Sequence, residues 1–136
     1  MSSESTPPQS ATAFHQVLIL VALAIFGGGG TVDLPKLVKK SVAKGERREV
    51  AVKAAEGIVQ RVEALRQITF RARRDMHDAV APRLFDSTAL DALFTRFDGE
   101  AERVQAELLD LRFEMRDAMT PEEWTELFRR RDDAGT

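Results

Sequence analysis

The chain of 136 residues contains no cysteine, no tyrosine and only two histidines. The absence of cysteine excludes disulfide bonds, thiolate metal sites and thiol nucleophiles. The scarcity of histidine and tyrosine leaves few of the usual acid–base groups. Lys and Arg total 20 against 22 Asp and Glu, so the chain has no overall positive field that would attract nucleic acid. We therefore expect no nucleic-acid partner.

The residues that are abundant favour helices. Apolar residues make up 43% of the chain and charged residues 31%, which fits one globular or helical-bundle domain. Leu, Ala, Glu and Arg dominate, and all four are good helix formers. Glycine is sparse outside one run, Gly27 to Gly30. The composition predicts an all-α protein.

The N-terminal region divides into a polar tail and an apolar segment. Residues 1–12 are rich in Ser, Thr and Pro and are predicted to be a disordered tail. No Asp, Glu, Lys or Arg occurs from Ser5 to Val32. A membrane-spanning helix needs roughly 20 predominantly apolar residues; the strongly apolar part, Val17 to Phe26, is shorter, and counting from Ala11 to Val32 reaches that length. We interpret residues 13–30 as a single-pass membrane anchor that ends in a flexible glycine joint, with residues 13–32 contacting lipid. Two alternatives stay open: a cleaved export signal, and a buried helix of a soluble protein.

The charges that flank the apolar segment bear on its orientation. Lys36, Lys39, Lys40 and Lys44 follow the segment, and no Lys or Arg precedes it. The positive-inside rule then places the main domain in the cytoplasm. Because long domains can cross the membrane regardless of this rule, the sequence does not decide on which side of the membrane the main domain lies.

Residues 31–131 are predicted to form a long antiparallel helical hairpin. Asp33 and Pro35 suit a helix start, and Gly45 marks a weak point or kink. Beyond it, apolar or small residues recur with the alternating four–three spacing of a coiled coil; they are Ala51, Ala55, Ile58, Val62, Leu65, Thr69, Ala72, Met76 and Ala79. Val59, Ile68 and Val80 are expected to widen this face. Ala81-Pro82 ends the first arm.

The second arm repeats the pattern after a short link. Asp86, Ser87 and Thr88 are candidate N-caps. The apolar positions then are Leu90, Phe94, Phe97, Ala101, Val104, Leu108, Leu111, Met115 and Ala118. The first arm carries Arg61, Arg66, Arg71, Arg73 and Arg74, and the second carries Asp91, Asp98, Glu100, Glu102, Glu107 and Asp110. Antiparallel packing is expected to set the basic stretch near residues 91–102.

A short C-terminal helix follows the second arm. Thr120 and Glu123 form a capping box, Pro121 takes the first helical position, and Met119 and Trp124 are placed as a hydrophobic staple. The apolar face of this helix is expected to dock on the start of the first arm, around residues 42–55. Residues 132–136 are expected to be a disordered tail.

The sequence from Leu108-x-x-Leu111-Arg112 to Met119-Thr120-Pro121-Glu122-Glu123 resembles the Spy/CpxP-like group of periplasmic helical-hairpin proteins. It is similar to that group's L-T-x-x-Q helix start behind an Arg-rich arm. The resemblance implies a membrane or export segment, a hairpin and a role as a stress-response or metal-response sensor or a holdase-like chaperone. The family Gln is replaced by Glu123 or Trp124, and the metal-sensing His/Glu/Met set is missing. The resemblance therefore implies the fold more than a ligand.

Several candidate sites can be weighed from the residues. Met76-His77-Asp78 invites a metal interpretation, but Met115 and Met119 lie at the opposite end of a hairpin, so we predict no metal site. A narrow hairpin offers no pocket that would shift the pKa of a carboxylate, so we predict no enzyme, no catalytic residue and no cofactor.

The remaining candidates are a partner-binding surface and a basic patch. The second arm and the last helix carry more apolar side chains than a two-helix seam can cover; these are Leu93, Phe94, Phe97, Leu109, Phe113, Trp124, Leu127 and Phe128. The basic patch is Arg66, Arg71, Arg73 and Arg74. We expect a membrane-tethered binding or sensing module whose partner is a second copy, as a homodimer, or a membrane protein. The alternative is a structural accessory subunit of a larger membrane protein complex.

Overall fold

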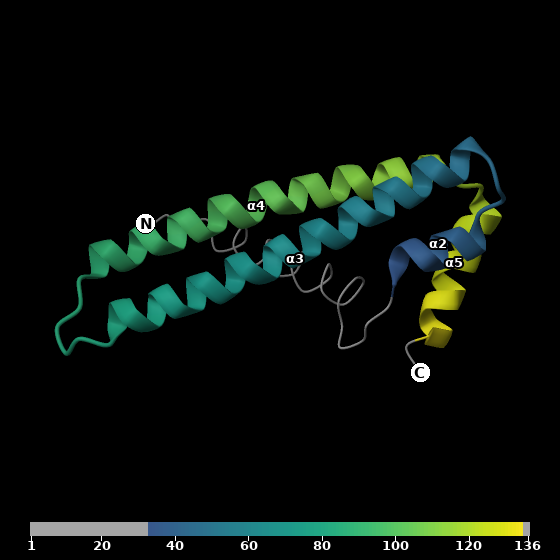
Figure 1. Ribbon diagram of the computed structural model, residues 1–136. Coiled ribbons are helices and arrows are strands. Elements are labelled where there is room, and N and C mark those ends of the chain that lie inside the picture. The colour runs from purple at the N-terminus through teal and green to yellow at the C-terminus, as the bar shows by residue number, and fades with distance from the viewer. Residues whose placement is uncertain (1–32, 135–136) are drawn as a thin grey trace, which may run out of the picture.

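The computed structural model describes residues 33–134, which are all-helical without strands. The helices are α2 (Leu34–Ser41), α3 (Glu46–Val80), α4 (Ser87–Asp117) and α5 (Pro121–Ala134). α3 and α4 lie side by side and antiparallel, and α2 and α5 lie together at the end away from the hairpin turn (Figure 1). The prediction of an all-α hairpin with a short C-terminal helix is confirmed.

The predicted tail, anchor and glycine joint fall in residues 1–32, outside the part of the chain that the structure describes. Among residues 33–134, no helix combines the length and the apolar character needed to cross a membrane.

The helix ends are set by the residues that the sequence singles out. The Asp33 carboxylate accepts a hydrogen bond from the backbone N–H of Lys36 at 3.2 Å, and Asp86 accepts one from the N–H of Thr88 at 2.9 Å. Each caps a helix start by satisfying a donor that lacks an intrahelical partner. α3 ends at Val80, directly before Ala81-Pro82, because proline cannot donate to the helix ladder.

The expected kink near Gly45 is a complete break between two helices. Gly45 has a φ of +143°, a conformation that residues with a Cβ rarely adopt. α2 ends at Ser41 before this turn and folds back to pack against both α3 and α5. The turn therefore places α2 against the base of the hairpin, where α5 also packs on it.

The core follows the predicted heptad seam but is unevenly distributed along the hairpin. Its hairpin members are Ala51, Ala54, Ala55, Ile58, Val62, Leu65 and Ile68 on α3 and Ala101, Val104, Leu108 and Met115 on α4. No side chain from Thr69 to Glu100 is buried. We call residues 69–100 the distal part of the hairpin; it includes the turn and has no core of its own.

Two residues expected to widen the core face are exposed. Ile68 is buried as predicted, but Val59 and Val80 are each more than two-fifths exposed. Both lie on a flank of α3 that has no neighbouring helix within the described residues, because α4 covers only one stripe of α3.

α5 begins as predicted and docks differently. The Thr120 hydroxyl accepts from the Glu123 N–H at 3.1 Å, and the Glu123 carboxylate accepts from the Thr120 N–H at 2.8 Å, which completes the capping box. The helix packs mainly on α2 instead of residues 42–55, since α2 folds back and occupies that position. It also continues to Ala134, so residues 132–134 are helical and do not belong to a tail.

Candidate docking surface

The base of the hairpin is held by one carboxylate that joins three segments. Glu123 of α5 accepts from the backbone N–H of Ala43 at 3.0 Å and from the Arg47 guanidinium at 2.8 Å. Arg47 also donates to the carbonyl of Ala118, at the end of α4, at 3.1 Å. We call Arg47, Glu123 and their backbone partners the base clamp. It fixes the position of α5 and of the α2–α3 turn relative to α4.

The electrostatics of the base clamp favour the ionised carboxylate. The Arg47 hydrogen bond, followed by the backbone N–H of Thr120, lowers the pKa of Glu123 from its usual value of 4.5 to about 2. The same contact raises the pKa of Arg47. The Glu123 side chain is only 13% exposed whereas that of Arg47 is 49% exposed, so water screens the pair from one side only.

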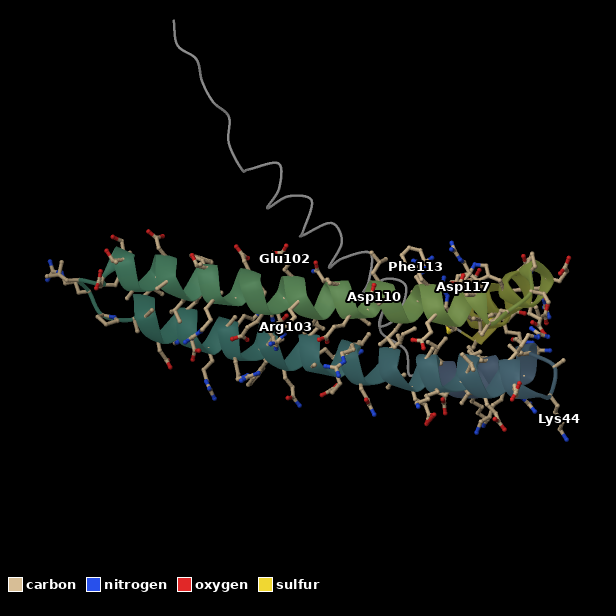
Figure 2. The ribbon with its side chains drawn as sticks, turned by 90° about the horizontal axis from the view of Figure 1, so that it is seen from above. Lys44, Glu102, Arg103, Asp110, Phe113 and Asp117 are labelled. Atoms are coloured by element: carbon tan, nitrogen blue, oxygen red, sulfur yellow. The ribbon has the colours of Figure 1, made fainter. Side chains whose placement is uncertain are left out.

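The predicted partner-binding residues divide into exposed and internal groups. Phe94, Leu109 and Phe113 are 45%, 51% and 44% exposed. Figure 2 shows Phe113 projecting from the side of α4 that faces away from α3, where Arg116 lies over its ring at 5.0 Å. Leu93 and Phe97 are half-buried between the arms. Only the first group is exposed on the surface of the chain.

The predicted C-terminal members are largely occupied within the chain. Leu127 is buried and packs in the core, so its assignment to a partner surface is wrong. Trp124 is half-buried against the core and meets Phe128 edge-on, with ring centroids 4.9 Å apart. Arg112 and Arg131 lie over these two rings. These side chains are occupied because α5 docks on α2 through its apolar face.

The basic patch lies near residues 91–102, as expected, since Arg71 lines a groove with Leu93, Arg96 and Glu100. None of its four arginines forms an ion pair with α4. Arg66 lies 3.7 Å from Glu63 of its own helix, and Arg74 lies 3.9 Å from its neighbour Asp75. Within residues 33–134, Arg71 and Arg73 form no ion pair. Exposed pairs contribute only about 0.2–1 kcal/mol each, so these long side chains have little reason to adopt one geometry.

Two other ion pairs connect the arms and show which residues of the two arms lie level with each other. Arg61 Nη1 lies 3.1 Å from Glu107 Oε2, and Asp75 Oδ2 lies 3.4 Å from Arg96 Nη2. The second pair lines a groove of about 250 Å³ between the arms, together with Ile68, Arg71, Ala72, Leu93, Phe97 and Glu100. Both pairs lie on the same side of the hairpin, which we call the groove side.

The opposite side of the hairpin carries a mixed apolar and charged surface that the sequence reasoning did not identify. Successive side chains on a helix are rotated by 100°. A residue two positions from a groove-side residue is therefore rotated by about 200° and points to the opposite side of the hairpin. The resulting surface, which we call the side face, is formed by Val59 and Arg73 of α3 and Asp98 and Leu109 of α4, each two residues from a member of a groove-side ion pair. All four side chains are exposed. The seven-residue spacing of Val59, Arg66 and Arg73 is the signal that could have revealed it.

The side chains that were considered as metal ligands lie apart in the structure. No group of three or more His, Asp and Glu side chains among residues 33–134 is arranged to hold a metal ion. Met76 lies in the distal part, whereas Met115 and Met119 are buried near the base. His77 is exposed beside Asp78, with 3.7 Å between Nδ1 and Oδ1. The candidate site considered below is the side face.

Comparison of the chain with protein-family models, with curated proteins and with solved structures found no match in any of the three.

Proposed function

We propose that this protein is a membrane-tethered helical docking module. The segment before α2 holds the chain at a membrane, and the hairpin projects about 50 Å from its base, given 1.5 Å per residue. The distal part and the side face bind a protein. The resemblance to the Spy/CpxP-like hairpins supports the same class of function.

The observation that carries this proposal is the uneven burial along the hairpin. Residues 69–100 hold no buried side chain, whereas Phe70, Leu84, Phe85 and Phe94 are exposed there. Helices in water gain most of their stability from burial of an apolar face and little from propensity. Two long arms with bare apolar flanks thus gain stability when a partner covers them.

The docking role is tested by photocrosslinking in living cells. A photoreactive amino acid replaces Phe94 in the full chain, and a matched variant carries it in place of Glu56, which is exposed on the outer side of α3. Position 94 should give protein adducts of defined mass and position 56 should not. Absence of adducts at position 94 would refute the docking function.

The tether is tested by fractionation. The full chain should stay in the membrane pellet after an alkaline wash, whereas a chain that begins at residue 33 should be in the supernatant. Recovery of both in the supernatant would refute the tether. Protease digestion of intact cells then reports the side on which the hairpin lies.

A further inference from the structure

We propose that the side face binds a second copy of this chain, so that two hairpins form a four-helix bundle. This inference rests on the proposed docking function and names its partner. The argument uses charge, register and area.

The side face carries complementary charges that are not satisfied within the chain. Arg73 belongs to α3 and Asp98 to α4, and neither forms an ion pair with any residue from 33 to 134. Glu102 is also unpaired among these residues, and it projects from α4 away from α3 (Figure 2). In a two-fold interface, a contact of one residue with another residue of the second copy occurs twice, once in each direction. A hairpin with a basic α3 and an acidic α4 is therefore complementary to a second copy when each α3 packs on the α4 of the other copy.

Two two-fold arrangements can bring the side faces together. If the axis runs across the helices, α3 meets α3 and α4 meets α4, which sets like charges against each other. If the axis runs parallel to the helices, each α3 lies on the α4 of the second copy and every neighbour is antiparallel. Charge favours the parallel axis. It also brings the two hairpin bases to the same end, as tethering to one membrane requires.

The two groove-side ion pairs predict which residues meet. Val59 is two residues before Arg61, and Leu109 is two residues after Glu107, so the Arg61–Glu107 pair sets Val59 level with Leu109. In the same way, the Asp75–Arg96 pair sets Arg73 level with Asp98.

With the parallel axis, residues that are level within one hairpin also face each other across the interface. Val59 then packs on Leu109 of the second copy, and Arg73 lies against Asp98 of the second copy.

The area of the hairpin is sufficient for such a dimer. α4 has 31 residues and is about 46 Å long, and two helices side by side are about 20 Å wide. Each copy would then cover about 900 Å², close to the ~800 Å² per partner of a standard stable interface. The distal part alone offers about half of this. Leu109 and Val59, outside the distal part, are therefore needed as well.

The absence of cysteine from the chain permits a direct test. Val59→Cys and Leu109→Cys are made as separate full chains, purified in the same mild detergent, mixed and oxidised. We expect a disulfide-linked dimer in the mixture and little in either variant alone. Cross-linking of Val59→Cys alone to the same extent as the mixture would overturn the arrangement. Absence of cross-links in all samples would overturn the dimer.

Two controls separate the side face from other contacts. A mixture of Glu56→Cys and Asp110→Cys, which are both exposed and are not members of the side face, should give no dimer. In sedimentation experiments, Arg73→Asp should lower the dimer fraction, and adding Asp98→Arg should restore it. Association through residues 1–32 would be insensitive to both changes and would count against the proposal.

The outcome also distinguishes this inference from the docking function. Photoadducts at position 94 with the mass of two chains support both proposals. Adducts with a different protein, in the absence of the Val59–Leu109 cross-link, leave the docking function in place and refute the second copy as partner.

Discussion

Replacing Glu123 by glutamine tests whether the base clamp stabilises the fold. The substitution keeps the shape of the side chain but removes the charge that accepts from Arg47 and from the N–H groups of Ala43 and Thr120. The shift of the Glu123 pKa from 4.5 to about 2 sets a ceiling of about 3 kcal/mol, at 1.36 kcal/mol per unit. Because half of the Arg47 side chain is exposed, screening reduces the expected loss to about 1.5–2.5 kcal/mol.

The pH dependence identifies the charge as the cause. The folded-state pKa of Glu123 lies below its unfolded value, so its stabilisation is fully present above pH 4.5 and is lost as the pH falls towards 2. Wild type and Glu123→Gln should therefore differ at pH 7 and converge near pH 2. The measurement is urea unfolding of the purified chain followed by circular dichroism.

A matched control and two outcomes make this test decisive. Glu122→Gln removes a neighbouring carboxylate from the same first turn, where Glu122 is exposed and forms no ion pair within residues 33–134. It should cost no more than about 0.3–1 kcal/mol through the helix dipole. Equal losses for the two variants, or a Glu123→Gln difference that persists at pH 2, would refute the role assigned to the clamp.

Two further pairs of variants test the packing of the hairpin, again by urea unfolding. Gly99→Ala should stabilise the chain by about 0.8–1 kcal/mol, because its added methyl group meets open space. Gly57→Ala should stabilise it less, since its methyl group would lie 3.1 Å from Leu111. Equal stabilisation by the two variants would contradict the close packing at Gly57. Ile58→Ala should cost about 2–5 kcal/mol because Ile58 is buried. Val59→Ala should cost under about 1 kcal/mol at concentrations where the chain is monomeric, and a larger loss would mean that Val59 is covered within one copy.

The helix ends were predictable because they depend on local chemistry. The Thr120–Glu123 box and the caps at Asp33 and Asp86 each involve hydrogen bonds between residues no more than three positions apart. Pro82 ends α3 through its own missing donor. The heptad spacing likewise defined the stripe that each arm turns towards the other.

The docking of α5 could not be predicted, because it depends on the direction of a turn. The sequence marks Gly45 as a weak point or kink, but a glycine permits many chain directions. The observed φ of +143° sends α2 back along the base, so that it covers the face of Leu127 and Trp124. A partner-binding prediction for those two residues could not anticipate that cover.

The side face was missed for a related reason. The apolar pattern around α3 is wider than one helix can cover, so Val59 and Ile68 look equivalent in the sequence. Only the position of α4 shows that Ile68 is buried and Val59 is exposed. The charges gave no better guide, since exposed ion pairs are too weak to determine how two helices rotate against each other.

Burial decreases along the hairpin from its base to its turn, so the two ends are stabilised differently. At the base, four helices, the clamp and a continuous core hold the fold by contacts within one chain. Towards the turn, the same two helices continue without a buried side chain. A chain selected only for its own stability gains nothing from arms that extend beyond their core, because each additional exposed residue adds conformational entropy to the cost of folding. Under the proposed docking function, the partner that covers the arms explains their length. In the proposed dimer, each α3 would pack on the α4 of the other copy. This packing would supply both the missing apolar contacts and the missing partners for the charged side chains.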